Sequence, residues 1–206
     1  MKSLFITTIL LFCLFIDNIS AQENYPSFLQ KFSIEVGGGY HLPFSPYRNI
    51  STNDYAGLRN YYVGANIAIT DLWGVRLTYA NNTFTDKNNK SNELTLQKMM
   101  AEATFNLLQA IQSQQPPFEI VVHSGVGFSR GEEYRTPDID KIVNFQIGLM
   151  PLYRITKNFS IHLDAIYVFN FKQNQGYDGR YIYEDIRDVT GSYLLLNMGL
   201  GVKFDF

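Results

Sequence analysis

The feature that most limits the fold is a period of two along the chain, and it is clearest in the last segment, residues 192–206. Within this segment every second residue is large and apolar, and the residues between them are mostly small or polar. Such a period indicates a β-strand with one apolar face and one polar face. The apolar face comprises Leu194, Leu196, Met198, Leu200, Val202, Phe204 and Phe206.

The same alternation recurs in seven earlier segments, so we expect eight strands in all. The connections between them alternate between long polar loops and shorter links. An even number of strands of about 10–13 residues, joined in this way, is typical of barrels that cross a bilayer. We therefore expect an all-β fold, an eight-stranded antiparallel up-and-down transmembrane β-barrel. The predicted strands span residues 31–42, 59–70, 73–80, 95–107, 119–128, 143–154, 159–172 and 192–206.

Two segments depart from the simple pattern. Residues 95–107 are rich in Ala, Met, Glu, Leu and Gln, which favour a helix. The loops on either side leave room for a strand, and we expect a strand there. Pro151 falls on the apolar face of the sixth strand and cannot donate to a ladder, which predicts a bulge or the end of the strand.

The beginning of the chain is similar to a secretory signal. Lys2 precedes an apolar run over residues 4–16, and small residues stand before an expected cleavage site after Ala21. The run is shorter than the about 20 residues of a membrane-spanning helix. We expect residues 1–21 to be a signal peptide and residues 22–206 to form a single barrel domain. No later apolar run reaches spanning length, so no transmembrane helix is expected.

Composition argues against several classes of function. The only cysteine, Cys13, lies inside the expected signal. The mature chain then has no thiol for a disulfide, a thiolate metal site or a nucleophile. The formal net charge of −2 argues against a nucleic-acid-binding protein, which would show a basic face. We expect no cofactor.

Alternation alone leaves open which face of the barrel points inward. A soluble barrel such as a lipocalin turns its apolar face inward, whereas a membrane barrel turns it toward lipid. The terminal Phe206 and the aromatic residues at the ends of the apolar face favour the membrane. The charges on the second face, which include Lys172 and Asp205, are about balanced, as expected for a narrow lumen filled by side chains. The expected lumenal charge network is Glu35, Arg76, Lys98, Glu102, Glu119, Arg154, Asp164 and Lys203.

This network has two interpretations, a gate for a narrow ion path or a plug. An unpaired buried charge is costly, and we expect a plug. His41, His123 and His162 fall on the same inward face, where we expect hydrogen bonds within the network and no metal site. His123 and Ser124 are neighbours that point to opposite faces, unlike the His-x-Ser pair of a lipid A deacylase. We therefore expect no enzyme.

Two long loops combine acidic and aromatic side chains. Tyrosines in such loops suit recognition of a partner, and the acidic residues suit divalent ions near lipopolysaccharide. The alternative is an ordinary solvated loop. The expected partner contacts are Tyr134, Tyr177, Tyr181 and Tyr183.

The expected signal, the eight alternating strands and the terminal residues 199–206 together resemble a small outer-membrane barrel of the OmpA-like or PorT-like family of Bacteroidota. The resemblance covers essentially the whole mature chain and rests on pattern, without a unique motif. It implies an outer-membrane location with both termini periplasmic, contact with outer-membrane lipid or lipopolysaccharide, and docking on other outer-membrane proteins. OmpA itself continues into a peptidoglycan-binding domain, which we do not expect here.

These features predict a structural or accessory subunit of a larger outer-membrane complex, with a plugged polar lumen. The first alternative is a narrow channel for ions or small solutes. A lipid-modifying enzyme and a soluble lipocalin-like binder are the others.

Overall fold

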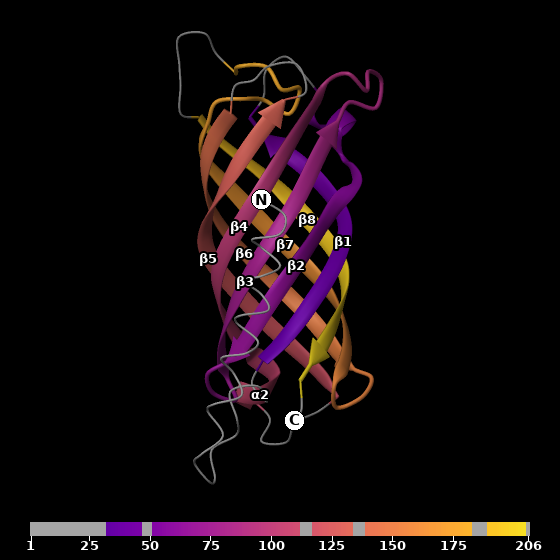
Figure 1. The fold of residues 1–206 in the computed structure, drawn as a ribbon, viewed down its shortest axis with the longest axis vertical. Coiled ribbons are helices and arrows are strands. Elements are labelled where there is room, and N and C mark those ends of the chain that lie inside the picture. Colours follow the sequence, from indigo (N-terminus) through magenta and orange to yellow (C-terminus); the bar gives the residue numbers. More distant parts are fainter. Residues whose placement is uncertain (1–31, 47–50, 112–116, 134–138, 183–188, 205–206) are drawn as a thin grey trace, which may run out of the picture.

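The computed structural model describes residues 32–46, 51–111, 117–133, 139–182 and 189–204. Eight antiparallel strands form a closed barrel in which each strand pairs with its chain neighbours and β8 closes on β1 (Figure 1). The expected all-β, eight-stranded up-and-down barrel is confirmed, while the expected signal peptide lies outside the described residues. The elements are β1 (Phe32–Ser45), η3 (Thr52–Tyr55), β2 (Gly57–Ala68), β3 (Trp73–Thr85), β4 (Glu93–Asn106), α2 (Leu107–Ile111), β5 (Phe118–Glu133), β6 (Ile139–Arg154), β7 (Phe159–Gln173) and β8 (Val189–Lys203).

Two tight turns define one end of the barrel. Between β2 and β3 the hydroxyl of Thr70 accepts two backbone N–H groups of its own turn, and Thr156 does the same between β6 and β7. The start of β1 lies at this end too, since Ser33 pairs with both Asn66 near the end of β2 and Lys203 at the end of β8. We call this the short-turn end and the opposite one the long-loop end.

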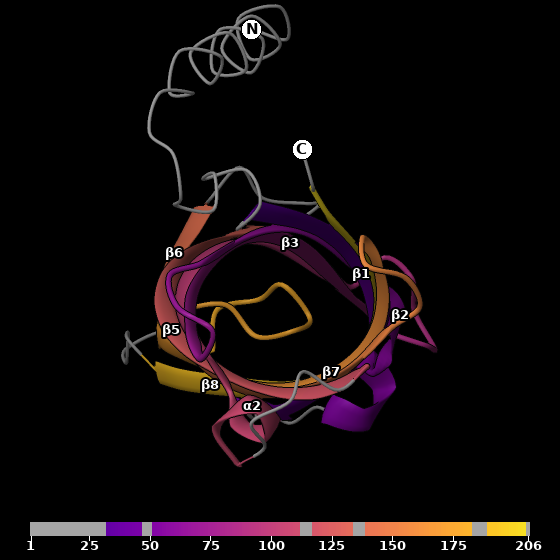
Figure 2. The same ribbon diagram turned by 90° about the horizontal axis from the view of Figure 1, so that it is seen from below.

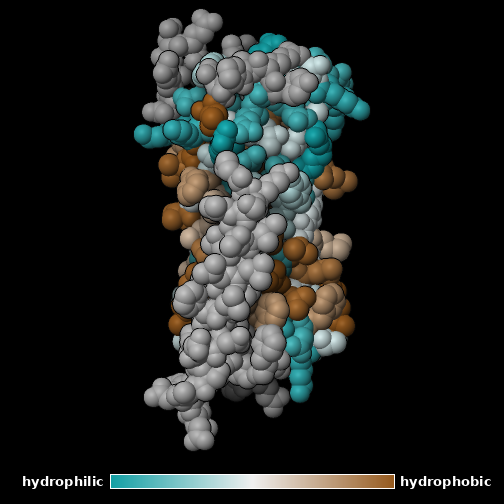
Figure 3. Space-filling model, in the orientation of Figure 1, coloured by the Kyte–Doolittle hydropathy of each residue, from teal (hydrophilic) through white to brown (hydrophobic). Residues whose placement is uncertain are grey.

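The apolar faces of the strands lie on the outside of the barrel. Tyr61, Val126 and Leu163 are 59%, 62% and 57% exposed. Figure 3 shows hydrophobic side chains on both flanks of the barrel and hydrophilic ones gathered at the long-loop end. The soluble alternative, in which the apolar face points inward, is therefore wrong.

The segment with mixed propensities is a strand over most of its length. β4 pairs with β3 on one side and with β5 on the other, and a short helix begins only at Leu107. Neighbouring strands supply partners for both edges of β4, and this tertiary pairing overrides the helix propensity of its residues.

The bulge or strand end expected at Pro151 is wrong. β6 continues through this residue and keeps its register with β5. Its register with β7 is also the same on both sides, with Leu149 opposite Ala165 and Leu152 opposite His162. Because the pairing with β5 is complete, the strand tolerates one missing N–H group.

The strands extend further at the long-loop end than the sequence predicts. β5 and β6 still pair where Glu132 faces Ile139, between the expected strands 119–128 and 143–154. A shift in register between β7 and β8 follows Asn170, and Lys172 there has a φ of 62°. The expected inward position of Lys172 is wrong: it is exposed, because an extra residue reverses the side on which a side chain lies.

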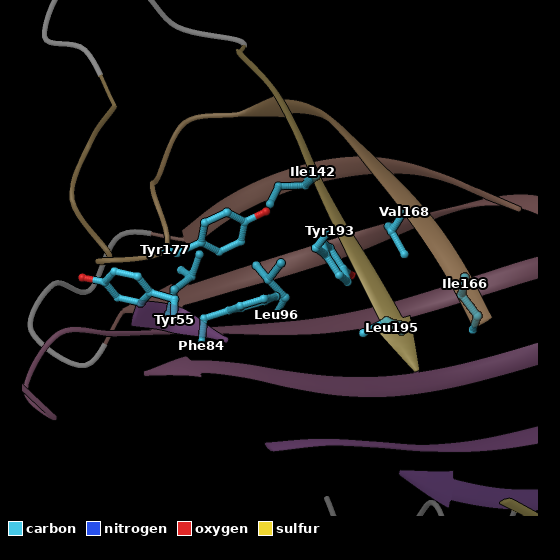
Figure 4. Packing of buried hydrophobic residues seen from close by; sticks show 10 residues of the cluster. Tyr55, Phe84, Leu96, Ile142, Ile166, Val168, Tyr177, Tyr193 and Leu195 are labelled. Atoms are coloured by element: carbon cyan, nitrogen blue, oxygen red, sulfur yellow. The ribbon is translucent and has the colours of Figure 1, made fainter. Parts of the chain in front are cut away.

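An apolar core fills the lumen at the long-loop end (Figure 4). The ring of Phe84 lies 4.5 Å from that of Tyr177 and 5.3 Å from that of Tyr193, centroid to centroid. This core is not expected from the sequence, which predicts a polar lumen throughout. Its buried residues are Tyr55, Phe84, Leu94, Leu96, Ile142, Ile166, Val168, Tyr177, Tyr193 and Leu195.

The connection 174–182 lies across the barrel opening at the same end, and Figure 2 shows it within the ring of strands. The carboxylate of Asp140 accepts backbone N–H groups at the start of this connection at 2.7 and 2.9 Å. The hydroxyl of Tyr177 lies 2.8 Å from the carbonyl of Ser45 and 3.0 Å from that of Ser192. Burial raises the pKa of the Tyr177 hydroxyl well above its ordinary value, so the group stays a neutral donor.

Candidate functional site in the barrel lumen

Arg76 on β3 lies at the centre of the lumen and is 1% exposed. Its Nε donates to Glu35 at 2.6 Å and its Nη2 donates to Asp164 at 3.1 Å. Its Nη1 lies 3.6 Å from Glu102. The three carboxylates come from β1, β7 and β4, so one planar guanidinium, which suits several oxygen acceptors at once, joins strands from around the barrel.

His123 on β5 bridges two of the same carboxylates. Its Nδ1 lies 2.6 Å from Glu102 and its Nε2 lies 2.9 Å from Asp164. An imidazole with a proton on both nitrogens donates on both sides. In that form the three cations Arg76, Lys98 and His123 lie among the three carboxylates. We call these residues the charged layer: Glu35, Arg76, Lys98, Glu102, His123 and Asp164.

Lys98 joins this layer through an amide. Its Nζ donates to the side-chain oxygen of Gln146 at 2.7 Å, and the amide nitrogen of Gln146 donates to Glu102 at 2.7 Å. The ammonium also lies 5.6 Å from the ring centre of Tyr193, which belongs to the apolar core. Lys98 therefore connects the charged layer with the core above it.

Tyr62 and His162 form the next contact toward the short-turn end. The hydroxyl of Tyr62 hydrogen-bonds the Nε2 of His162, and the Arg76 guanidinium lies 5.5 Å from the ring centre of Tyr62. The other ring nitrogen of His162 is buried without a hydrogen-bond partner among the described residues.

A cup with a volume of about 250 Å³ occupies the lumen at the short-turn end. Its lining includes Glu35 and His162 from the network and Glu119, Arg154 and Lys203. The guanidinium of Arg154 pairs with Glu119, which also accepts a 2.7 Å hydrogen bond from an asparagine amide. The cup reaches the charged layer at Glu35.

Beyond the charged layer the lumen holds the buried side chains of the apolar core. A void of about 10 Å³ lies beside Lys98, Asn60 and Asn197, which is no more than a single water requires. The amide of Asn60 donates to Asn197 across this level. The charged layer and the apolar core therefore lie one after the other along the lumen.

The structure thus divides the expected lumenal network into two groups. Glu35, Arg76, Lys98, Glu102 and Asp164 come together in one buried layer. The other three expected residues, Glu119, Arg154 and Lys203, line the cup.

Sequence reasoning places His123 within the charge network but does not assign Gln146 or Tyr62 to it. Both alternate in phase with the inward charges, and this is the signal that could have found them. Their contacts depend on register between strands that are far apart in the sequence.

The expected partner tyrosines lie in different surroundings. Tyr177 is fully buried in the apolar core, so the structure places it away from the outer surface, whereas Tyr181 is 46% exposed. Tyr134 and Tyr183 lie outside the described residues.

Within the described parts of the chain, no group of three or more His, Cys, Asp or Glu side chains is arranged to hold a metal ion. The same residues include no helix that is long and apolar enough to cross a membrane.

Comparison with known proteins identifies solved structures with a similar fold but no related family. No protein-family model matches the chain, and no curated protein matches it. Among solved structures, Neisserial surface protein A (NspA) matches with a TM-score of 0.58 at 16% identity, over 84% of this chain and 97% of that chain. A major outer membrane protein from Thermus thermophilus matches with a TM-score of 0.49 at 14% identity, over 84% and 98% of the two chains. The likeness to NspA shows a shared fold, the closed antiparallel β-barrel.

Proposed function

We propose that the protein is an integral outer-membrane β-barrel with a sealed lumen, and that it serves as a structural or accessory subunit of a larger outer-membrane complex. The observation that carries the proposal is that the apolar faces of the strands point outward and the charged faces point into the lumen. Large apolar side chains are exposed on its outside, while Arg76, Lys98 and three carboxylates are buried within it.

The exposed apolar surface supports a lipid environment. Outward-facing residues such as Leu77, Val126 and Leu163 are more than half exposed, and contiguous apolar surface of this kind is rare on monomeric soluble proteins. Strands of 12–16 residues are long enough for a tilted crossing of a bilayer. Lipid removes the outer surface from water, and the closed barrel leaves no unpaired strand edge.

The sealed lumen supports a role that does not depend on transport. The charges of the buried layer lie against opposite charges or polar partners, and the apolar core and the connection 174–182 close the long-loop end. The surfaces left to act are the outer wall and the long loops, where Tyr181 is exposed. We place the protein with both termini in the periplasm, because short turns are usual on that side. We also propose that the chain is a member of the OmpA-like or PorT-like family, which its sequence pattern resembles.

The test is fractionation of the cells that make the protein, followed by gel migration of the extracted protein with and without boiling. We expect recovery in the outer-membrane fraction and a band whose mobility changes on heating. Chemical cross-linking in intact cells should then give a discrete larger species through the wall or the loops. A freely soluble protein with unchanged mobility would overturn the membrane assignment. A barrel that cross-links to no other protein would overturn the accessory role.

A narrow channel is the second candidate, and the cup that reaches from the short-turn end to the charged layer is the observation that favours it. Planar-bilayer recordings distinguish the two candidates. A sealed barrel gives no unitary conductance. A conductance that is lost on charge reversal at Glu102 or Arg154 would establish the channel and overturn the sealed lumen.

A further inference from the structure

Three cations lie together on the outer wall at the long-loop end, and we call them the cation cluster: Arg130, Lys141 and Lys172. Arg130 on β5 and Lys141 on β6 are direct cross-strand partners, and both are exposed. Lys172 is turned outward by the irregularity in β7. It follows Phe171, whose partner on β6 is Val143, two residues from Lys141.

This arrangement gives the fold no evident stability. Like charges directly opposite each other on neighbouring strands are destabilising. Arg130 is held by Glu132, with 2.7 Å between the guanidinium nitrogen and the carboxylate oxygen. Among the described residues, no carboxylate pairs with the ammonium group of Lys141 or Lys172. The cluster therefore keeps a net positive charge that the described protein does not neutralise.

Directly below the cluster, toward the short-turn end, the wall is apolar and aromatic. Phe128 and Val143 are cross-strand partners, each two residues along its strand from Arg130 or Lys141. Phe171 pairs with Val143 on the other side. The rings continue along β6 and β7, with 6.5 Å between the centroids of Phe171 and Phe169 and 6.0 Å between those of Phe169 and Phe145. A positive rim thus stands on an apolar wall.

We propose that this face of β5, β6 and β7 binds a lipid that carries a phosphate group in the outer leaflet. The phosphate would lie against the cation cluster, where the guanidinium of Arg130 offers a fork that fits phosphate oxygens. The acyl chains would lie along the rings of Phe128, Phe169 and Phe171. The inference rests on the proposed function, which places this end of the barrel at the outer leaflet.

The test compares two double variants with the same change in charge. In Lys141→Gln/Lys172→Gln both unpaired lysines of the cluster are replaced. In the control, Lys90→Gln/Lys157→Gln, one exposed lysine is replaced in the β3–β4 loop and one in the β6–β7 turn. Each folded protein, in neutral detergent micelles, is titrated with phosphatidic acid and separately with phosphatidylcholine of the same acyl chains. Native mass spectrometry counts the lipids bound per barrel.

We expect the unaltered protein and the control to bind one phosphatidic acid in preference to phosphatidylcholine. The cluster variant should bind it with a Kd raised by about fivefold for each lysine removed. Equal Kd values for the cluster variant and the control, or no preference between the lipids, would overturn the inference. A cluster variant that is less stable than the control without lipid would also overturn it, because the lysines would then serve the fold.

Heat-dependent gel mobility of the same preparations separates this inference from the proposed function. A protein without a heat-shifted band would overturn the proposed membrane barrel itself. A heat-shifted band without a preference for phosphatidic acid would overturn only the proposed lipid site.

Discussion

Replacement of Arg76 by methionine tests whether the charged layer holds the barrel together. Methionine has a similar length but no charge and no donor. The change removes the contacts of the guanidinium with Glu35 and Asp164, at 2.6 and 3.1 Å, and its approach to Glu102. The three carboxylates of the charged layer then face Lys98 and, in its doubly protonated form, His123 as the remaining cations of that layer.

The expected loss in the free energy of unfolding follows from the burial of Arg76. Arg76 and its three partners are 5% exposed or less at their side chains, and removal of one partner from a buried ion pair typically costs about 3–5 kcal/mol. The control is Arg154→Met. Arg154 pairs with Glu119, but its side chain is 36% exposed, and solvent reduces the value of such a pair to about 1 kcal/mol or less. The same truncation at two depths should therefore differ by about 2–5 kcal/mol.

Equilibrium urea unfolding in lipid vesicles measures this difference. The chain has a single tryptophan, Trp73, which is 52% exposed on the outer wall and reports on loss of the lipid environment. With a slope of about 2 kcal/mol per molar urea, we expect the midpoint of Arg76→Met to fall by about 2 M and that of Arg154→Met by less than about 0.5 M. Equal midpoints for the two variants would refute the argument that the buried layer stabilises the barrel.

Three further predictions use the same measurement, and the first two have matched controls. Tyr177→Ala removes a fully buried ring and should cost about 3–5 kcal/mol, whereas Tyr181→Ala removes an exposed ring and should cost little; equal losses would mean that burial of the Tyr177 ring does not stabilise the barrel. Gly148→Ala places a Cβ directly against the buried ring of His123, while Gly57→Ala meets nothing closer than 3.7 Å. The first should lose about 1–3 kcal/mol through overpacking, and the tight packing is refuted if both are tolerated. Val126→Arg on the outer wall should cost about 2–4 kcal/mol in a bilayer, and an unchanged midpoint would argue against contact with lipid.

The sequence largely predicts which residues lie on the outer wall. Alternation identifies all eight strands and assigns Leu77, Val126 and Leu163 to one face, since lipid-facing residues have to be apolar at every second position. The same parity assigns Arg76 and Glu102 to the other face, and the terminal Phe206 together with the aromatic residues of the apolar face indicates that this other face is the lumen. The prediction fails at Lys172, because one inserted residue reverses the parity after it, and no residue type marks that insertion.

The inside of the barrel is less predictable, since inward residues meet partners from strands far apart in the chain. Leu96 and Val168 share the polar face of their strands, yet they pack in an apolar core. Alternation says which side a residue occupies but not how far along the barrel it lies. Pro151 shows the complementary limit: a single missing donor is tolerated when the other edge of the strand is fully paired.

The order of the amino acids alone specifies strands with two unlike faces, because successive residues point to opposite sides of a strand whatever its neighbours are. The contacts of His123 with Glu102 and Asp164 and the apolar core at one end arise only in the folded barrel. These features depend on closure of the sheet and on the register between strands, which bring residues dozens of positions apart within hydrogen-bonding distance. No local pattern in the chain encodes those distances.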